Sequence, residues 1–233
     1  MSTIHRHLIA AGITVKRTLP IPSPWNSSEL VIQRQEFARE FPHRAMDRKI
    51  IYLDESHFNL SRYMGRGREI EGKTPLTPII NFRTQTVTLI LAIDIEGVVY
   101  FEFVRSYSGS SKKGTNSKDF KNFLLNLSLK TNRVRGSIIV MDNASIHAES
   151  GIMETFTHLK QFQHIDCAFL PAHSPFMNPV EYAFELIKEE VTKHKFEPNL
   201  DTLEKKITEA VNKFASAHAQ GCFAIAAKYR KMA

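Results

Sequence analysis

Cysteine is scarce in this sequence, which has only Cys167 and Cys222 among its 233 residues. The two thiols lie far apart in the chain and lack the spacing of metal ligands, so a zinc site built on cysteine is not indicated. Cys167 lies in an apolar segment, where a free thiol is typical of the core of a protein in a reducing compartment. The sequence therefore predicts an intracellular location rather than secretion.

Long apolar runs are also absent. No segment is apolar over the length that a bilayer-spanning helix needs, and the sequence shows neither a signal-peptide pattern nor an internal repeat. We therefore expect no membrane partner. The hydrophobic fraction of 42% is ample for a core, and 233 residues can form one large domain with a small appendage.

Acidic residues are the minority among the charged side chains. The 24 Asp and Glu residues face 31 Lys and Arg residues, which gives a formal net charge of +7. A positive net charge favours an anionic partner, but charge alone does not identify that partner as nucleic acid. It becomes informative beside an acidic catalytic cluster, because a Mg²⁺-dependent enzyme that acts on DNA needs both.

Two apolar segments each end on an aspartate. KIIYLDES carries Asp54, and GSIIVMDNASIH carries Asp142. Continuous apolar runs of this length are typical of strands buried on both faces, and the carboxyl ends of such strands form the binding crevice of an open α/β sheet. A single Asp after a strand is usually a turn residue. Two aspartates, one after each of the two most apolar predicted strands, indicate a shared site.

A third acid belongs to residues 169–190, FLPAHSPFMNPVEYAFELIKEE. After a turn through Ser174 and Pro175, a helix is predicted with Asn178 as N-cap and Pro179 at its first position. Glu181 then falls on the first turn of that helix. Its spacing from Asn178 also fits a capping box, in which Glu181 would only hydrogen-bond the helix start. Read with the other two acids, it completes a cluster whose mutual repulsion a cation would relieve, and all-oxygen ligands favour Mg²⁺ or Mn²⁺.

These three segments resemble the Asp-Asp-Glu motifs of Tc1/mariner-type transposases: LDESHFNL around Asp54, MDNASIH around Asp142 and SPFMNPVEYAFE around Glu181. The resemblance covers roughly residues 27–200 and implies a ribonuclease-H-like catalytic domain. Two departures leave the subfamily open without removing a ligand. The gap of 38 residues, 143–180, is longer than usual, and Phe184 stands where the family often has Trp.

The expected fold is α/β, a mixed five-stranded sheet flanked by helices. Three strands in meander precede two that alternate with helices, and right-handed crossovers allow the first and fourth strands to lie side by side. The resemblance implies the strand order 3-2-1-4-5, although the sequence alone permits others. The neighbouring Glu55 should point to the opposite face from Asp54, and Asp94 beside the hairpin turn is expected to serve that turn.

The expected elements, from residue patterns alone, are a helix over 27–40, a strand over 49–54, a hairpin over 86–107 turning near Glu96 and Gly97, a helix capped by Ser117, a strand over 137–142, a helix over 150–161, a strand over 164–170 and a helix over 200–217. Residues 2–11 predict a short helix ended by Gly12. By resemblance, residues 1–26 are a remnant of a helix-turn-helix DNA-binding region plus linker, residues 27–233 are the catalytic domain with C-terminal helices, and the chain looks truncated at its N-terminus.

The resemblance also implies chemistry and partners. Two Mg²⁺ or Mn²⁺ ions would be held by Asp54, Asp142 and Glu181, with Asp54 bridging both. Asn143 and His147 would have supporting roles, although His147 also fits a plain helix-start residue, and Asn178 would shape the loop. A basic loop over 61–85, at the position of the family's clamp loop, would contact DNA and a partner subunit in a homodimer, and a flexible basic loop over 108–116 would also contact DNA. The DNA-binding residues of the two loops are Arg62, Arg66, Arg68, Lys73, Lys112 and Lys113. The first loop also fits a disordered basic segment.

Three functions are consistent with these features. The leading hypothesis is the DNA-cutting and strand-joining domain of a Tc1/mariner-like transposase, located in the nucleus of a eukaryote or in the cytoplasm or nucleoid of another cell. The second is a ribonuclease-H-like nuclease acting on RNA or hybrids, which the SPFMNPVE segment disfavours. The third is a non-catalytic DNA-binding protein descended from a transposase, which the intact acids disfavour.

Overall fold

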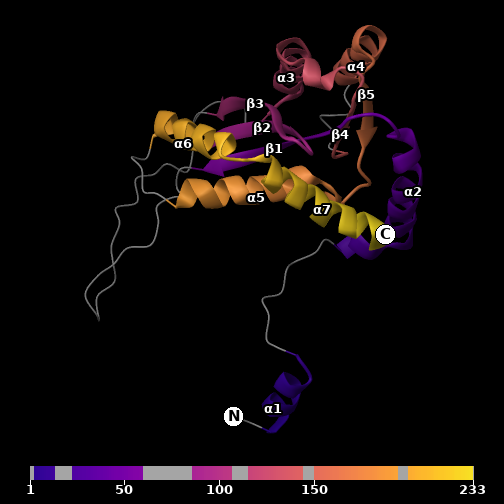
Figure 1. Ribbon diagram of the computed structural model, residues 1–233, viewed down its shortest axis with the longest axis vertical. Coiled ribbons are helices and arrows are strands. Elements are labelled where there is room, and N and C mark those ends of the chain that lie inside the picture. The colour runs from indigo at the N-terminus through magenta and orange to yellow at the C-terminus, as the bar shows by residue number, and fades with distance from the viewer. Residues whose placement is uncertain are drawn as a thin grey trace.

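The computed structural model describes residues 3–13, 23–59, 86–106, 115–143, 150–193 and 199–232 (Figure 1). Its strands are β1 (Ile50–Asn59), β2 (Thr86–Asp94), β3 (Gly97–Ser106), β4 (Ile138–Met141) and β5 (Asp166–Phe169). Its helices are α1 (Thr3–Ala10), α2 (Ser28–Arg44), α3 (Ser117–Lys130), α4 (Ser150–Gln163), α5 (Pro179–Thr192), α6 (Leu200–Asn212) and α7 (Ser216–Met232). Short 3₁₀ turns lie at Ser23–Asn26 (η1), Asn132–Val134 (η3) and Pro175–Met177 (η5).

The strands form one sheet in the order β3-β2-β1-β4-β5, which confirms the predicted topology. β1 pairs antiparallel with β2, and β2 pairs antiparallel with β3. β4 pairs parallel with β1 on one side and with β5 on the other. The carboxyl ends of β1, β4 and β5 therefore lie at the same edge of the sheet.

Helices cover both faces of this sheet, so apolar side chains on both sides of its strands are buried (Figure 1). Tyr52 and Phe58 of β1 enter the core that α5, α6 and α7 close, whereas Ile51 and Leu53 enter the core closed by α3 and α4. Alternation along the strand places Asp54 on the α5 side and Glu55 on the opposite side, as expected. No helix in the described ranges is long and apolar enough to cross a membrane.

β1 is longer than predicted, and Asp54 is not its last residue. Antiparallel pairing with β2 continues from Tyr52 to Asn59, because the polar residues after Asp54 still have a partner strand there. Parallel pairing with β4 stops at Tyr52. Asp54 thus lies just past the point where β1 parts from β4, and this separation opens a space between the two strand ends.

Two helix ends also differ from the prediction. α2 continues past residue 40 to Arg44 with Pro42 inside it, and its end is closed by the Ala45 N–H donating to Phe41 O at 2.9 Å. The helix expected over 200–217 is two helices, α6 and α7. The chain breaks between them where Phe214 turns into the core, and the His218 ring accepts the Ala215 N–H at the start of α7.

The helix starts are capped by side chains. Ser27 caps α2 by accepting the Leu30 N–H. α3 is capped by Asn116 rather than Ser117, because Asn116 forms a capping box with Asp119. Asp94 has the predicted turn role: its Oδ1 accepts the Glu96 N–H at 2.8 Å, and both of its oxygens also accept from Arg133.

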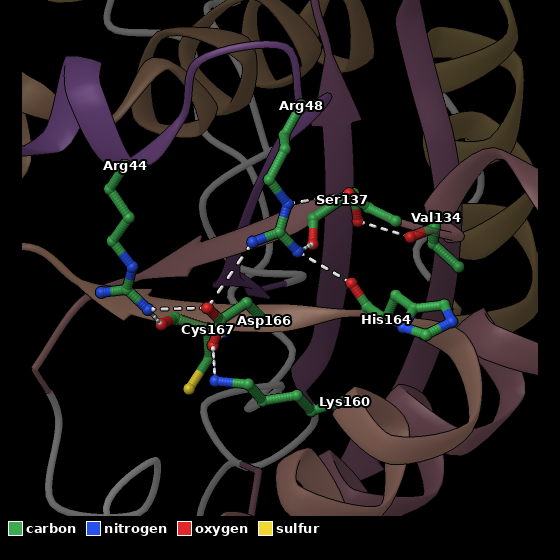
Figure 2. A network of polar contacts seen from close by, with 9 residues as sticks. Arg44, Arg48, Val134, Ser137, Lys160, His164, Asp166 and Cys167 are labelled. Atoms are coloured by element: carbon green, nitrogen blue, oxygen red, sulfur yellow. Dashed lines mark hydrogen bonds and ion pairs between the residues drawn. The ribbon is translucent and has the colours of Figure 1, made fainter.

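A polar network fastens the end of α2 to the amino ends of β4 and β5 (Figure 2). The Arg48 guanidinium donates to three backbone carbonyls, those of Gly136 (3.0 Å), Ser137 (2.8 Å) and His164 (2.8 Å). Asp166 at the start of β5 is surrounded by Arg44, Arg48 and Lys160, with N–O separations of 3.3, 3.6 and 3.6 Å. This end of the sheet is closed by cations, and the carboxyl end is left for the acidic site.

Candidate active site

The three predicted acids line one cavity of about 370 Å³ at the carboxyl edge of the sheet. Asp54 comes from β1, Asp142 directly follows β4, and Glu181 stands on the first turn of α5. The other lining residues are Asn143, Leu170, Pro171, Ala172, His173, Ser174, Pro175 and Asn178. Residues far apart in the sequence, on three different elements, thus line the same cavity.

Asp54 is the most buried of the three acids, with 9% of its surface exposed. Burial is the main reason that its pKa lies well above the usual range, and repulsion from Glu181, Asp142 and Glu55 raises it further. The Glu55 N–H, which donates to Asp54 Oδ1 at 2.8 Å, acts in the opposite direction. The negative charge at Asp54 is therefore costly in the metal-free protein.

Asn178 joins the helix start to Asp54. Its Oδ1 accepts the Val180 N–H at 3.2 Å, which caps α5, and its Nδ2 donates to Asp54 Oδ2 at 2.8 Å. The Asn178 N–H donates to Pro175 O at 2.9 Å, so this group is already used and is not bound by Glu181. The capping box considered from sequence is therefore not formed.

Glu181 lines the cavity and is an exposed residue. Partial desolvation raises its pKa, and Asp142 and Glu185 add to that increase. Lys188, two turns further along α5, lowers the pKa of Glu181 by its positive charge. The Lys188 Nζ lies 5.6 Å from the ring centre of Phe58 and 5.8 Å from that of Phe184.

Two features of the site were missed from sequence. His173 follows β5 with a left-handed backbone (φ 51°) and lines the cavity. It could have been expected there, because the end of β5 lies beside that of β4. Lys188 could have been found from its helical spacing of seven residues, which puts it on the same side of α5 as Glu181. Ser174, which was expected to shape the loop, donates to Ala172 O at 3.1 Å.

The other predicted site residues divide into two groups. Asn143 is exposed beside Asp142 and lines the cavity, as a supporting role requires. The remaining residues lie outside the described residues, so their places stay predictions; they are His147, Arg62, Arg66, Arg68, Lys73, Lys112 and Lys113.

The donor set of the cavity suits a hard divalent cation. Carboxylate and amide oxygens are the groups that Mg²⁺ and Mn²⁺ prefer. Burial and the neighbouring acids disfavour the ionised form of Asp54 and raise its pKa, and a bound cation would stabilise that form. Within the described ranges, no three His, Cys, Asp or Glu side chains approach closely enough to form a ready-made site for one ion.

Fold and site together define a ribonuclease-H-like domain in which three carboxylates line a cavity at the edge of a mixed sheet. The chain belongs to the DDE superfamily endonuclease family, whose sequence profile matches residues 49–204. This membership confirms the family and the enzyme class predicted from the three motifs. Neither the nuclease acting on RNA nor the non-catalytic descendant is favoured.

Solved structures show the same fold. The chain is similar to a Mos1 mariner paired-end complex with Mn, with a TM-score of 0.74 and 16% identity over 98% of this chain and 68% of that chain. A paired-end complex with Mg has a TM-score of 0.73 and 18% identity, and the match covers 98% of this chain and 69% of that chain. The catalytic domain of Mos1 mariner transposase has a TM-score of 0.64 and 15% identity, and the match covers 94% of this chain and 95% of that chain. A search of curated proteins found no match.

Proposed function

We propose that this chain is the catalytic domain of a Tc1/mariner-like transposase, which cuts DNA and joins the cut 3′ ends to target DNA. One observation carries the proposal. The acids of the three motifs, Asp54, Asp142 and Glu181, line a single cavity at the carboxyl edge of a sheet with the order β3-β2-β1-β4-β5. The match to Mos1 transposase complexes supports this function at the level of fold.

Asp54, Asp142 and Glu181 would hold two Mg²⁺ or Mn²⁺ ions, and Asp54 would contact both. The pKa of Asp54 responds to Glu181 and to Asp142, which supports the shared position. When bound, such ions activate a water nucleophile and stabilise the leaving oxygen of a phosphodiester. Related Mos1 structures contain Mn and Mg, which supports divalent ions for this chain.

The chain's own side chains orient the reactants. The buried wall of the cavity, which includes Leu170 and Asn178, excludes bulk water from Asp54. Asn143, exposed beside Asp142, is placed to donate to a phosphate oxygen, and His147 is proposed to support it. No covalent enzyme intermediate is needed, because water and then a DNA 3′-hydroxyl act as nucleophiles in the same cavity.

DNA is the proposed partner, and the chain would bind it as a homodimer. The phosphates would be contacted by the basic residues Arg62, Arg66, Arg68, Lys73, Lys112 and Lys113. The solved relatives include a complex with a left transposon end and a strand transfer complex. The proposed location is the nucleus of a eukaryote, or otherwise the cytoplasm or nucleoid.

Nicking of supercoiled plasmid in Mg²⁺ or Mn²⁺, with a chelator control, tests the proposal. Asp54→Ala, Asp142→Ala and Glu181→Ala should each abolish nicking and reduce the Mn²⁺-induced increase in Tm, because the ions bind only the native state. Glu36→Ala is the matched control, since Glu36 is an exposed acid on α2 outside the cavity. Equal Mn²⁺ stabilisation in all five proteins, wild type included, would contradict the assignment.

A further inference from the structure

Asn178 is the most enclosed polar residue of the site, with 1% of its surface exposed. Both ends of its side-chain amide are used: Oδ1 accepts the Val180 N–H, and Nδ2 donates to Asp54 Oδ2 at 2.8 Å. The residues joined by the second bond are 124 positions apart in the chain. Capping the helix requires only the first bond, and the second bond joins the start of α5 to β1.

The backbone around Asn178 is held without its side chain. The Met177 N–H donates to Ser174 O at 3.0 Å, and the Asn178 N–H donates to Pro175 O at 2.9 Å. The Tyr182 hydroxyl donates to Phe176 O at 3.0 Å, and Met177 is fully buried. The turn before α5 is thus fixed by backbone bonds and packing, so the amide of Asn178 is presented to Asp54 in one orientation.

We propose that Asn178 is a positioning residue that sets Asp54 and Glu181 relative to each other. One bond holds the Asp54 carboxylate, and the other holds the first turn of α5, which carries Glu181. This inference rests on the proposed function, because it assigns to Asn178 the alignment of two metal-binding carboxylates that come from different elements.

The amide is the group that this position needs. Asp54 Oδ1 accepts the Glu55 N–H and Oδ2 accepts the Asn178 amide, which fixes the plane of the carboxylate and leaves its remaining lone pairs for the cavity. A serine could still cap the helix, but its hydroxyl is too short to reach Asp54. An aspartate could also cap the helix, but it would place an acceptor against Asp54 in place of a donor.

Asn178→Ser therefore separates capping from positioning, and Asn199→Ser is the matched control. Asn199 caps α6 by accepting the Thr202 N–H at 2.8 Å, and it does not line the cavity. Asn178→Ser should weaken Mn²⁺ binding, measured by calorimetry on the folded protein, by about 10- to 100-fold, as is usual when a partner of a metal ligand is removed. Asn199→Ser should leave Mn²⁺ affinity at the wild-type value.

Intrinsic fluorescence monitors the loop in the same samples. Trp25 is the single tryptophan, and its ring lies 5.0 Å from that of Phe176, two residues before Asn178. An unchanged emission maximum in Asn178→Ser, together with weaker Mn²⁺ binding, supports the inference. Wild-type Mn²⁺ affinity in Asn178→Ser would overturn it and leave Asn178 as a cap.

Asn178→Asp is the second variant, for the case that Asn178→Ser does not fold. It keeps both the volume and the capping oxygen, and we expect at least tenfold slower plasmid nicking with an altered Mn²⁺ requirement. Wild-type nicking and a wild-type Mn²⁺ requirement in Asn178→Asp would overturn the inference. If the wild-type chain neither binds Mn²⁺ nor nicks DNA, the proposed function itself fails, and that result is distinct from these.

Discussion

At the scale of single residues, the site combines burial with repulsion. Asp54 is enclosed by protein and faces two other acids across one cavity. Its carboxylate has two hydrogen-bond donors, the Glu55 N–H and the Asn178 amide, but they do not offset the desolvation, because its pKa remains well above the usual range. Stability of the metal-free chain is thus lowered in favour of a cation-ready cavity.

Asp54→Asn should raise the Tm of the metal-free protein at neutral pH. A carboxyl whose pKa is raised by folding costs stability above its unfolded pKa, near 3.9, and costs none below it. The gain should therefore be present at pH 7 and vanish as the pH falls below about 4. Each 1 kcal/mol corresponds to about 2–4 °C in a chain of this size. Saturating Mn²⁺ should reverse the order of the two proteins in thermal unfolding, and an unchanged order would contradict the ligand role.

Glu181→Gln separates the ligand role from a structural one. Because Glu181 is exposed and closes no capping box, the free energy of unfolding should change by less than about 0.5 kcal/mol. Plasmid nicking should fall by more than about 100-fold, since a ligand matters more than a partner of a ligand. Glu185→Gln, one turn further along α5 and outside the cavity lining, should nick at close to the wild-type rate.

At the scale of elements, α2 is fastened to the sheet by its basic end. Arg48 donates hydrogen bonds to three backbone carbonyls at the amino ends of β4 and β5, and Arg44 and Lys160 form ion pairs with Asp166 (Figure 2). Another ionic contact ties α5 to the break between α6 and α7. There Glu190 accepts from Lys193 and Lys213, which lowers the pKa of Glu190 to about 2. These contacts hold α2 against the sheet and α5 against the segment between α6 and α7.

Arg48→Ala should lower the free energy of unfolding by about 1–3 kcal/mol, because carbonyls that accept from a charged donor would lose their partner. Arg39→Ala is the control on α2. Its side chain is 73% exposed and makes a 3.7 Å contact with the equally exposed Glu40, so its loss should change stability by less than about 0.5 kcal/mol. Urea unfolding measures both, and equal effects would show that the network is not stabilising.

At the scale of the whole molecule, a chain of positive net charge contains an acidic cavity. The net charge of +7 and the basic residues predicted to contact DNA favour binding to the DNA backbone, which depends on salt more than on sequence. Affinity for duplex DNA should fall linearly on a log–log plot against salt concentration. Arg66→Glu combined with Arg68→Glu should weaken binding and flatten that slope by about 0.9 for each phosphate that the protein no longer neutralises. A strong preference for one of two unrelated duplexes would contradict this prediction.

The residues alone predicted the strands and the three acids, but they left other strand orders open until the resemblance was added. Apolar strands, crossover lengths and the motifs around Asp54, Asp142 and Glu181 are local patterns, and the strand order followed from handedness and resemblance. Three features required the folded structure: the reach of β1 beyond Asp54, the break between α6 and α7 and the bond from Asn178 to Asp54. Each depends on a partner distant in the chain: β2 extends β1, burial of Phe214 divides the last helix, and α5 brings the amide of Asn178 to β1.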